Sequence, residues 1–142
     1  MEKISKDFFK GNEILFVGYS SKDKMFCNSV MNALVKNGFT VYPMNSRTKE
    51  GFDVKVYQTF EELPKVPETA YVLLKSENAR KVIKPLKDHG VKRILFQNNK
   101  IADREILDQC SQLGIEAVIG CPMMLYGSGL HRIHAFFAGV KR

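Results

Sequence analysis

A short turn near the N-terminus carries the residues of this chain best suited to bind a ligand. The apolar run Ile14–Val17 ends at Gly18, the small hydroxyl residues Ser20 and Ser21 follow, and an amphipathic segment begins at Lys24. Backbone amides at a strand-to-helix turn point toward one spot, and the positive end of the helix dipole reinforces them. The turn therefore predicts a site for a phosphate or diphosphate group. The alternative is a turn that only connects a first strand to a helix.

The end of the second predicted strand is the next candidate. Dinucleotide sites usually carry further glycines at the first turn and, about 20 residues on, a carboxylate that holds the ribose hydroxyls. Here the turn has no glycine after Gly18, and no carboxylate follows the second strand before Glu50. The strand is followed instead by Asn45, Ser46 and Arg47, which suit a phosphate on the ribose. This charge pattern favours NADP or coenzyme A over NAD.

Periodicity predicts the elements that would position these residues. The predicted strands are Ile14–Val17, Phe39–Tyr42, Ala70–Leu74, Arg93–Phe96 and Glu116–Ile119. The predicted helices are Lys24–Asn37, Glu77–His89 and Asp103–Leu113, with a short helix around Lys6–Lys10. Strands that alternate with helices imply right-handed crossovers and a parallel sheet. We therefore expect an α/β protein: a Rossmann-like, three-layer, doubly wound parallel sheet of about five strands, in one domain over residues 1–142.

Two segments depart from this regular alternation. The stretch Ser46–Pro67 predicts a crossover with a small extra strand and one turn of helix. Pro85 lies inside the helix predicted over Glu77–His89, and we expect it to bend that helix because proline lacks the N–H donor and its ring crowds the preceding turn.

Composition limits the classes of partner and compartment. The chain has 142 residues, 44% of them hydrophobic, and no apolar run long enough for a membrane span or a signal peptide. Its three cysteines form no paired spacing, which suits a reduced cytoplasm. The net charge of +7 suits nucleic acid or a small polyanion. The basic residues are scattered and no nucleic-acid-binding motif accompanies them, so nucleic acid is the weaker choice.

Five short motifs together resemble a known family. They are Phe16–Ser20, Gly38–Asn45, Thr59–Pro64, Ile94–Gln97 and Gly120–Pro122. In order and spacing, they resemble the small stand-alone CoA-binding proteins, Rossmann-like domains related to the CoA-binding domain of the succinyl-CoA synthetase alpha subunit. The resemblance spans nearly the whole chain.

The resemblance assigns candidate residues in four of these motifs and at the end of the third predicted strand. Gly18, Ser20 and Ser21 would contact the cofactor phosphates, and the segment from Pro43 to Asn45 would lie near the adenosine ribose and its phosphate. Leu74 and Lys75 would flank the adenine or the pantetheine arm, while Gln97 and Cys121 match family residues after the fourth and fifth strands. With the first turn and the ribose-phosphate segment, the candidate cofactor-binding set is Gly18, Tyr19, Ser20, Ser21, Lys24, Pro43, Asn45, Ser46, Arg47, Leu74, Lys75, Gln97 and Cys121.

The chain departs from the family pattern at several points. Tyr19 replaces a small residue, so it would either narrow the turn or stack on the adenine. Asn98 and Asn99 replace the usual proline and glycine after Gln97. The C-terminal tail lacks the Glu-His pairing common near the end of the family's chains.

Residues that could carry chemistry form no catalytic set. His131 and His134 have a spacing that could hold a metal, but we favour a surface pair because no acidic or cysteine partner is near in sequence. The Cys121 thiol could form a mixed disulfide with the pantetheine thiol under oxidation, although a packing role is favoured. No nucleophile–base motif or Walker loop is present.

We therefore predict a non-catalytic module that binds coenzyme A or an acyl-CoA. The alternatives are an NADP-binding oxidoreductase and a subunit of an acyl-CoA ligase that depends on a partner for catalytic residues. A nucleic-acid-binding or redox-regulatory protein is the weakest alternative. The sequence leaves open whether the chain forms a homodimer or joins a larger subunit.

Overall fold

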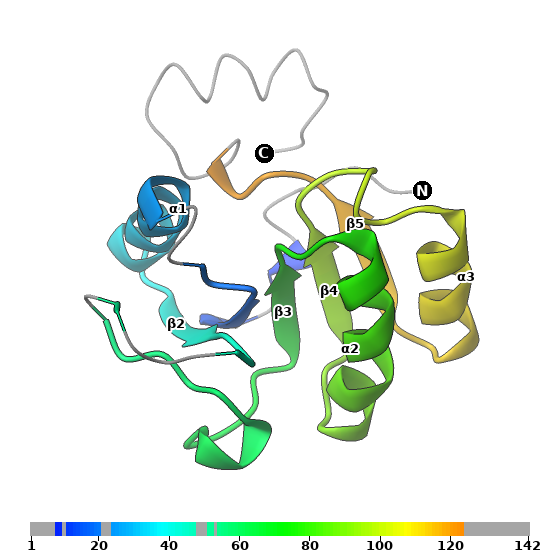
Figure 1. Ribbon diagram of the computed structural model, residues 1–142, viewed down its shortest axis with the longest axis horizontal. Coiled ribbons are helices and arrows are strands. Elements are labelled where there is room, and N and C mark those ends of the chain that lie inside the picture. The colour runs from blue at the N-terminus through cyan, green and yellow to red at the C-terminus, as the bar shows by residue number, and fades with distance from the viewer. Residues whose placement is uncertain (1–7, 10, 21–23, 48–50, 53, 124–142) are drawn as a thin grey trace.

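Five parallel strands form one sheet in the order β2-β1-β3-β4-β5 (Figure 1). This arrangement comes from a computed structural model that describes residues 8–9, 11–20, 24–47, 51–52 and 54–123. The strands are β1 Glu13–Val17, β2 Thr40–Met44, β3 Thr69–Val72, β4 Arg93–Phe96 and β5 Glu116–Ile119. The helices are α1 Lys24–Lys36, α2 Ser76–Asp88 and α3 Arg104–Gln112, with a one-turn 3-10 helix, η2, at Phe60–Glu62. The predicted α/β, Rossmann-like parallel sheet is confirmed.

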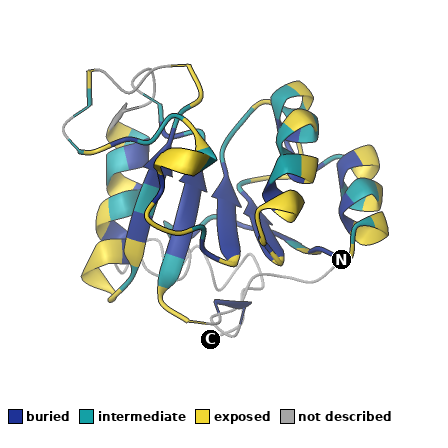
Figure 2. Cartoon of the chain, turned by 90° about the horizontal axis from the view of Figure 1, so that it is seen from below, coloured by how far each residue is buried: buried dark blue, intermediate teal, exposed yellow. Residues whose placement is uncertain are grey.

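The sheet is covered on both faces, which explains why its strands are almost continuously apolar. Because side chains alternate along a strand, neighbouring residues enter different cores. The core beneath α2 and α3 contains Leu15, Val17, Ala70, Val72, Ile94, Phe96, Ile83 and Ile106. The core beneath α1 contains Ile14, Phe16, Tyr71, Leu95, Val118, Val30 and Leu34. Figure 2 shows the strands largely buried between helices whose outer faces are exposed.

The boundaries of β4 and β5 agree with the prediction, whereas β2 and β3 differ. β2 starts at Thr40 and includes Pro43, where the prediction ended the strand at Tyr42. A proline is tolerated here because β2 is an edge strand. β3 ends at Val72 rather than Leu74, since the chain then turns toward α2.

The crossover between β2 and β3 covers the outer edge of β2. The predicted extra strand is a single bridge between Met44 and Tyr57, and the predicted turn of helix is η2. The Tyr57 N–H donates to the Pro43 carbonyl at 2.9 Å, and the Asn45 N–H donates to the Tyr57 carbonyl at the same distance. The crossover therefore holds the backbone where β2 ends.

Some predicted elements lie wholly or partly outside the described residues. Of the short helix predicted around Lys6–Lys10, only Phe8 and Phe9 are described. His131 and His134 lie outside the described part of the chain.

α2 continues through Pro85 to Asp88. Within the described residues, no helix is both long enough and apolar enough to cross a bilayer.

Candidate functional site

Most of the candidate residues lie just after one of the five strands, and these strand ends share one edge of the sheet. Because every strand pair is parallel, all five carboxyl ends lie at that edge. From β1 the chain first forms β2 on one side of β1. The next connection then crosses to form β3 on the other side of β1. Open α/β sheets bind ligands outside the carboxyl ends of the strands at such a change of direction. The topology thus brings the strand ends that carry most of the candidate residues to one edge of the sheet.

Gly18 lies where the ends of β1 and β3 approach each other. Its φ angle is +97°, and a Cβ atom there would lie 2.2 Å from the Leu73 carbonyl oxygen and 2.9 Å from Leu74 Cδ2. A side chain at this position would collide with backbone as well as adopting an unfavourable conformation. Glycine is therefore required where the two strand ends meet.

The main-chain amides of the first turn have partners within the protein. Gly18 and Tyr19 both donate to the Met44 carbonyl, at 2.9 and 3.1 Å. The Ser20 N–H donates to Cys27 Sγ at 3.4 Å. The prediction that these amides converge on a phosphate is therefore not supported in this arrangement, because each has an intramolecular acceptor. The residues of this turn that could still contact a phosphate are Ser20, through its half-buried side chain, and Ser21, which lies outside the described residues.

Tyr19 is a core residue. Only 1% of it is exposed, and its ring packs edge-on against Phe16 with centroids 5.1 Å apart. Its hydroxyl donates to Asn28 Oδ1 on α1. The hypothesis that this ring stacks on an adenine therefore conflicts with its burial. Tyr19 contributes to the edge of the site through its carbonyl oxygen instead.

Asn45 connects the ends of β1 and β2. Its Nδ2 atom donates to the Tyr19 carbonyl at 2.9 Å, and its Oδ1 atom accepts from the Arg47 N–H at 2.8 Å. Gln58 Nε2 lies 3.3 Å from both the Ser46 and Arg47 carbonyl oxygens. Ser46 and Arg47 are exposed on this hydrogen-bonded turn. The turn therefore presents a cation at the site edge from a fixed backbone.

Four further candidate residues differ in their placement. Pro43 is buried within β2, so its ring does not reach the site surface. Lys75 is exposed at the residue preceding α2, and its neighbour Leu74 is half-buried. Lys24 begins α1. Among the candidates whose side chains the structure describes, Lys75 is an exposed cation at the carboxyl edge, as Arg47 is.

Gln97 follows β4 and is half-buried. Its Oε1 atom accepts a hydrogen bond from the Tyr71 hydroxyl, and its N–H donates to the Val72 carbonyl at 3.3 Å. The ring of Tyr71 is completely buried. Both the main chain and the side chain of Gln97 are thus tied to β3.

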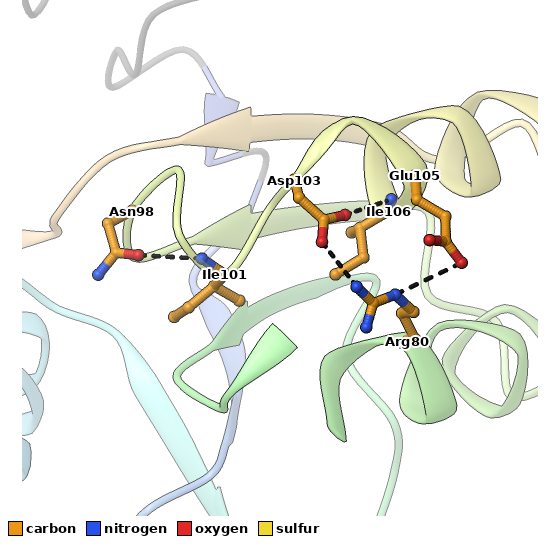
Figure 3. A network of polar contacts seen from close by, with 6 residues as sticks. All are labelled: Arg80, Asn98, Ile101, Asp103, Glu105 and Ile106. Atoms are coloured by element: carbon orange, nitrogen blue, oxygen red, sulfur yellow. Dashed lines mark hydrogen bonds and ion pairs between the residues drawn. The ribbon is translucent and has the colours of Figure 1, made fainter. Parts of the chain in front are cut away.

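The loop after Gln97 is held by side-chain hydrogen bonds to its own main chain. Asn98 Oδ1 accepts from the Lys100 and Ile101 N–H groups, both at 3.1 Å. Asn98 thus forms this local turn at a position where the family resemblance predicts a proline. It is followed by the α3 cap, where Asp103 Oδ1 accepts from the Ile106 N–H at 3.0 Å. Figure 3 shows the two turns together.

Arg80 joins this capped loop to α2. Its Nη2 atom lies 2.8 Å from Asp103 Oδ2, and its Nε atom lies 3.5 Å from Glu105 Oε1 (Figure 3). Gln109 Nε2 also donates to the Arg80 carbonyl at 3.4 Å. An aspartate at the start of a helical pattern, as at Asp103, is a recognisable cap signal. Its arginine partner, 23 residues away, has no such local signal.

Replacement of Asp103 should separate its two roles. Asp103→Ala removes the cap acceptor and the Arg80 partner, and we expect a loss of about 1–2 kcal/mol in the free energy of unfolding. Asp103→Asn keeps an oxygen for the Ile106 N–H and loses only the half-exposed ion pair, for which we expect less than about 1 kcal/mol. Chemical denaturation of the two variants measures the difference. Equal losses would show that the cap contributes nothing beyond the ion pair.

The three cysteines differ in accessibility. Cys27 and Cys110 are buried, and Cys121 is half-buried after β5. Burial raises the pKa of the Cys110 thiol to about 11, so this cysteine stays protonated at neutral pH. Cys121 is therefore the cysteine best placed to meet a ligand. The described residues contain no cluster of three metal-ligating side chains.

Comparisons with known proteins identify similar sequences and folds. A family model described as a CoA binding domain matches residues 12–127. A conserved hypothetical protein from Pyrococcus furiosus is 26% identical, with 81% of this chain and 98% of that chain covered and a TM-score of 0.68. A hypothetical protein from Pyrococcus horikoshii OT3 is 25% identical, with 84% and 83% covered and a TM-score of 0.70. No curated protein matches the chain.

Proposed function

Because the chain belongs to the CoA-binding domain family, we propose that it binds coenzyme A or an acyl-CoA without catalysing a reaction on it. The family match over residues 12–127 carries this proposal. The common edge formed by the carboxyl ends of the five strands supports it, because that edge is where open α/β sheets bind nucleotides.

The proposed cofactor runs along this edge. The adenosine phosphate lies near Asn45, Ser46 and Arg47, because the Arg47 side chain is an exposed cation on a hydrogen-bonded turn. The diphosphate lies near Ser20 and the start of α1, where the helix dipole favours an anion. The pantetheine arm then crosses β3 toward β4. The order of strands in the sheet supports this direction.

We further propose that the protein works in a reducing compartment such as the cytoplasm. All three cysteines are free thiols, and two of them are buried on different elements. Disulfides are rare in reducing compartments.

A ligand panel in thermal unfolding tests the proposed function. CoA, acetyl-CoA, dephospho-CoA, NAD, NADP and ATP are compared at equal concentration. A ligand at 100 times its Kd stabilises the folded state by about 2.7 kcal/mol, which corresponds to roughly 8 °C in Tm for a chain of this size. We expect CoA or acetyl-CoA to give the largest rise. A rise with NADP alone would favour the oxidoreductase alternative, and no rise with any ligand would reject the CoA assignment.

A further inference from the structure

A buried tyrosine orients the side-chain amide of Gln97. The Tyr71 ring is fully buried and packs edge-on against Phe16, with centroids 4.9 Å apart. From this fixed position its hydroxyl donates to Gln97 Oε1. Because the carbonyl end of the amide is used by Tyr71, the NH₂ end is directed elsewhere.

The Nε2 atom of Gln97 has no acceptor among the residues that the structure describes. Gln97 is half-buried at the carboxyl edge of the sheet. The main-chain N–H of Gln97 donates to the Val72 carbonyl, and the backbone after Gln97 is held by the turn that Asn98 forms. A donor held at a ligand-binding edge by a fixed backbone and a fixed partner is preorganised for an acceptor oxygen on a ligand.

The position of Gln97 in the sheet indicates which part of the proposed cofactor it meets. Adjacent strands lie about 4.8 Å apart, so the end of β4 is roughly 10 Å from the end of β1 and roughly 14 Å from the end of β2. With the adenosine phosphate at β2 and the diphosphate at β1, the pantetheine arm is the part that extends to β4. Each amide of pantetheine carries a carbonyl oxygen that accepts hydrogen bonds.

We propose that Gln97 Nε2 donates to a pantetheine amide carbonyl of the bound cofactor, and that Tyr71 is the positioning residue that aims this donor. This inference rests on the proposed function and extends it to a specific part of the ligand. In this proposal Gln97 recognises the pantetheine arm of the cofactor, whereas Arg47 recognises the phosphate on its adenosine ribose.

Calorimetric titration of three variants with two ligands tests the inference. The ligands are CoA and adenosine 3′,5′-bisphosphate, which lacks the pantetheine arm. We expect Gln97→Met to weaken CoA binding about tenfold and Tyr71→Phe about three- to tenfold, within the range of single hydrogen bonds. Because Tyr71 acts through Gln97, the double variant should bind CoA like Gln97→Met alone. Affinity for the bisphosphate should be unchanged in all three variants.

Two further variants serve as controls. Gln109→Met makes the same change at a half-buried glutamine on α3, and we expect its CoA affinity to match the wild type. Gln97→Glu keeps an acceptor for the Tyr71 hydroxyl but has no NH₂ group, and we expect it to weaken CoA binding at least as much as Gln97→Met.

The outcomes separate the inference from the proposed function. Wild-type affinity for CoA in Gln97→Met would overturn the inference and leave CoA binding intact. Equal weakening of CoA and the bisphosphate by Tyr71→Phe, additive with Gln97→Met, would show that Tyr71 has only a structural role. A wild-type protein that binds neither CoA nor acetyl-CoA would overturn the proposed function and the inference together.

Discussion

Gly18→Ala is expected to lower the free energy of unfolding by about 2–5 kcal/mol, the sum of a conformational cost and a steric cost. A left-handed conformation costs a non-glycine residue about 1–2 kcal/mol, and Gly18 has a φ of +97°. The added Cβ would also lie 2.2 Å from the Leu73 carbonyl oxygen. Relieving that overlap requires the ends of β1 and β3 to separate, which typically costs a further 1–3 kcal/mol, roughly.

Two other glycines allow the two causes to be separated. Gly38 and Gly90 follow α1 and α2 with φ angles of +93° and +98°, and a Cβ at either position would meet nothing within 4 Å. Alanine there should cost only the conformational part, about 1–2 kcal/mol, or roughly 3–6 °C in Tm. Thermal and denaturant unfolding of all three variants makes the comparison. If Gly18→Ala were no worse than the other two, the close contact between β1 and β3 would not constrain this position.

Arg47→Ala is expected to weaken CoA binding about tenfold and to leave dephospho-CoA binding unchanged. The two ligands differ only in the phosphate on the adenosine ribose. Charge-assisted hydrogen bonds contribute about 1.5–3 kcal/mol, and we take the lower end because the Arg47 side chain is exposed. Titration of CoA and dephospho-CoA against the wild type and the variant gives the ratio of the two Kd values for each protein. The wild type should prefer CoA, and the variant should have lost that preference.

A nearby lysine provides the matched control for charge. Lys55 is also exposed, and its Nζ atom lies 5.2 Å from the centre of the Tyr57 ring, beside the same turn. Lys55→Ala removes one positive charge without removing the proposed phosphate contact, so we expect less than about a twofold change for either ligand. A wild-type preference for dephospho-CoA, or equal weakening of both ligands by Arg47→Ala, would contradict the role assigned to Arg47.

Much of the fold was predictable because its signals are local. Buried parallel strands produce short apolar runs, as in Arg93–Phe96 and Glu116–Ile119, and both were predicted with their observed bounds. Glycines marked the ends of the helices, where a left-handed residue stops α1 and α2. The predicted end of β2 was wrong because the strand continues through Pro43. A proline is tolerated in a strand mainly at the edge of a sheet, and the position of β2 in the sheet is set by the tertiary structure.

The sequence predicted which loops form the candidate site. It did not predict which polar groups in those loops already have hydrogen-bond partners within the protein. Parallel topology alone brings the residues after each strand to one edge, so Asn45, Lys75 and Gln97 could be grouped before any contact was known. The sequence could not show that the Gly18 and Tyr19 amides donate to Met44. A turn motif specifies where amides are, and only the neighbouring strand specifies what they bind.

The sequence by itself determined the order of strands and helices along the chain, the apolar faces that form the two cores, and the presence of a glycine at the first turn. Only the tertiary structure decided that Tyr19 is enclosed in the core, that Tyr71 orients Gln97, and that Arg80 meets the α3 cap. The physical reason is the range of the interactions. Periodicity and capping act over a few residues, whereas these side chains find partners across the sheet or between helices, in positions set by strand register and helix packing.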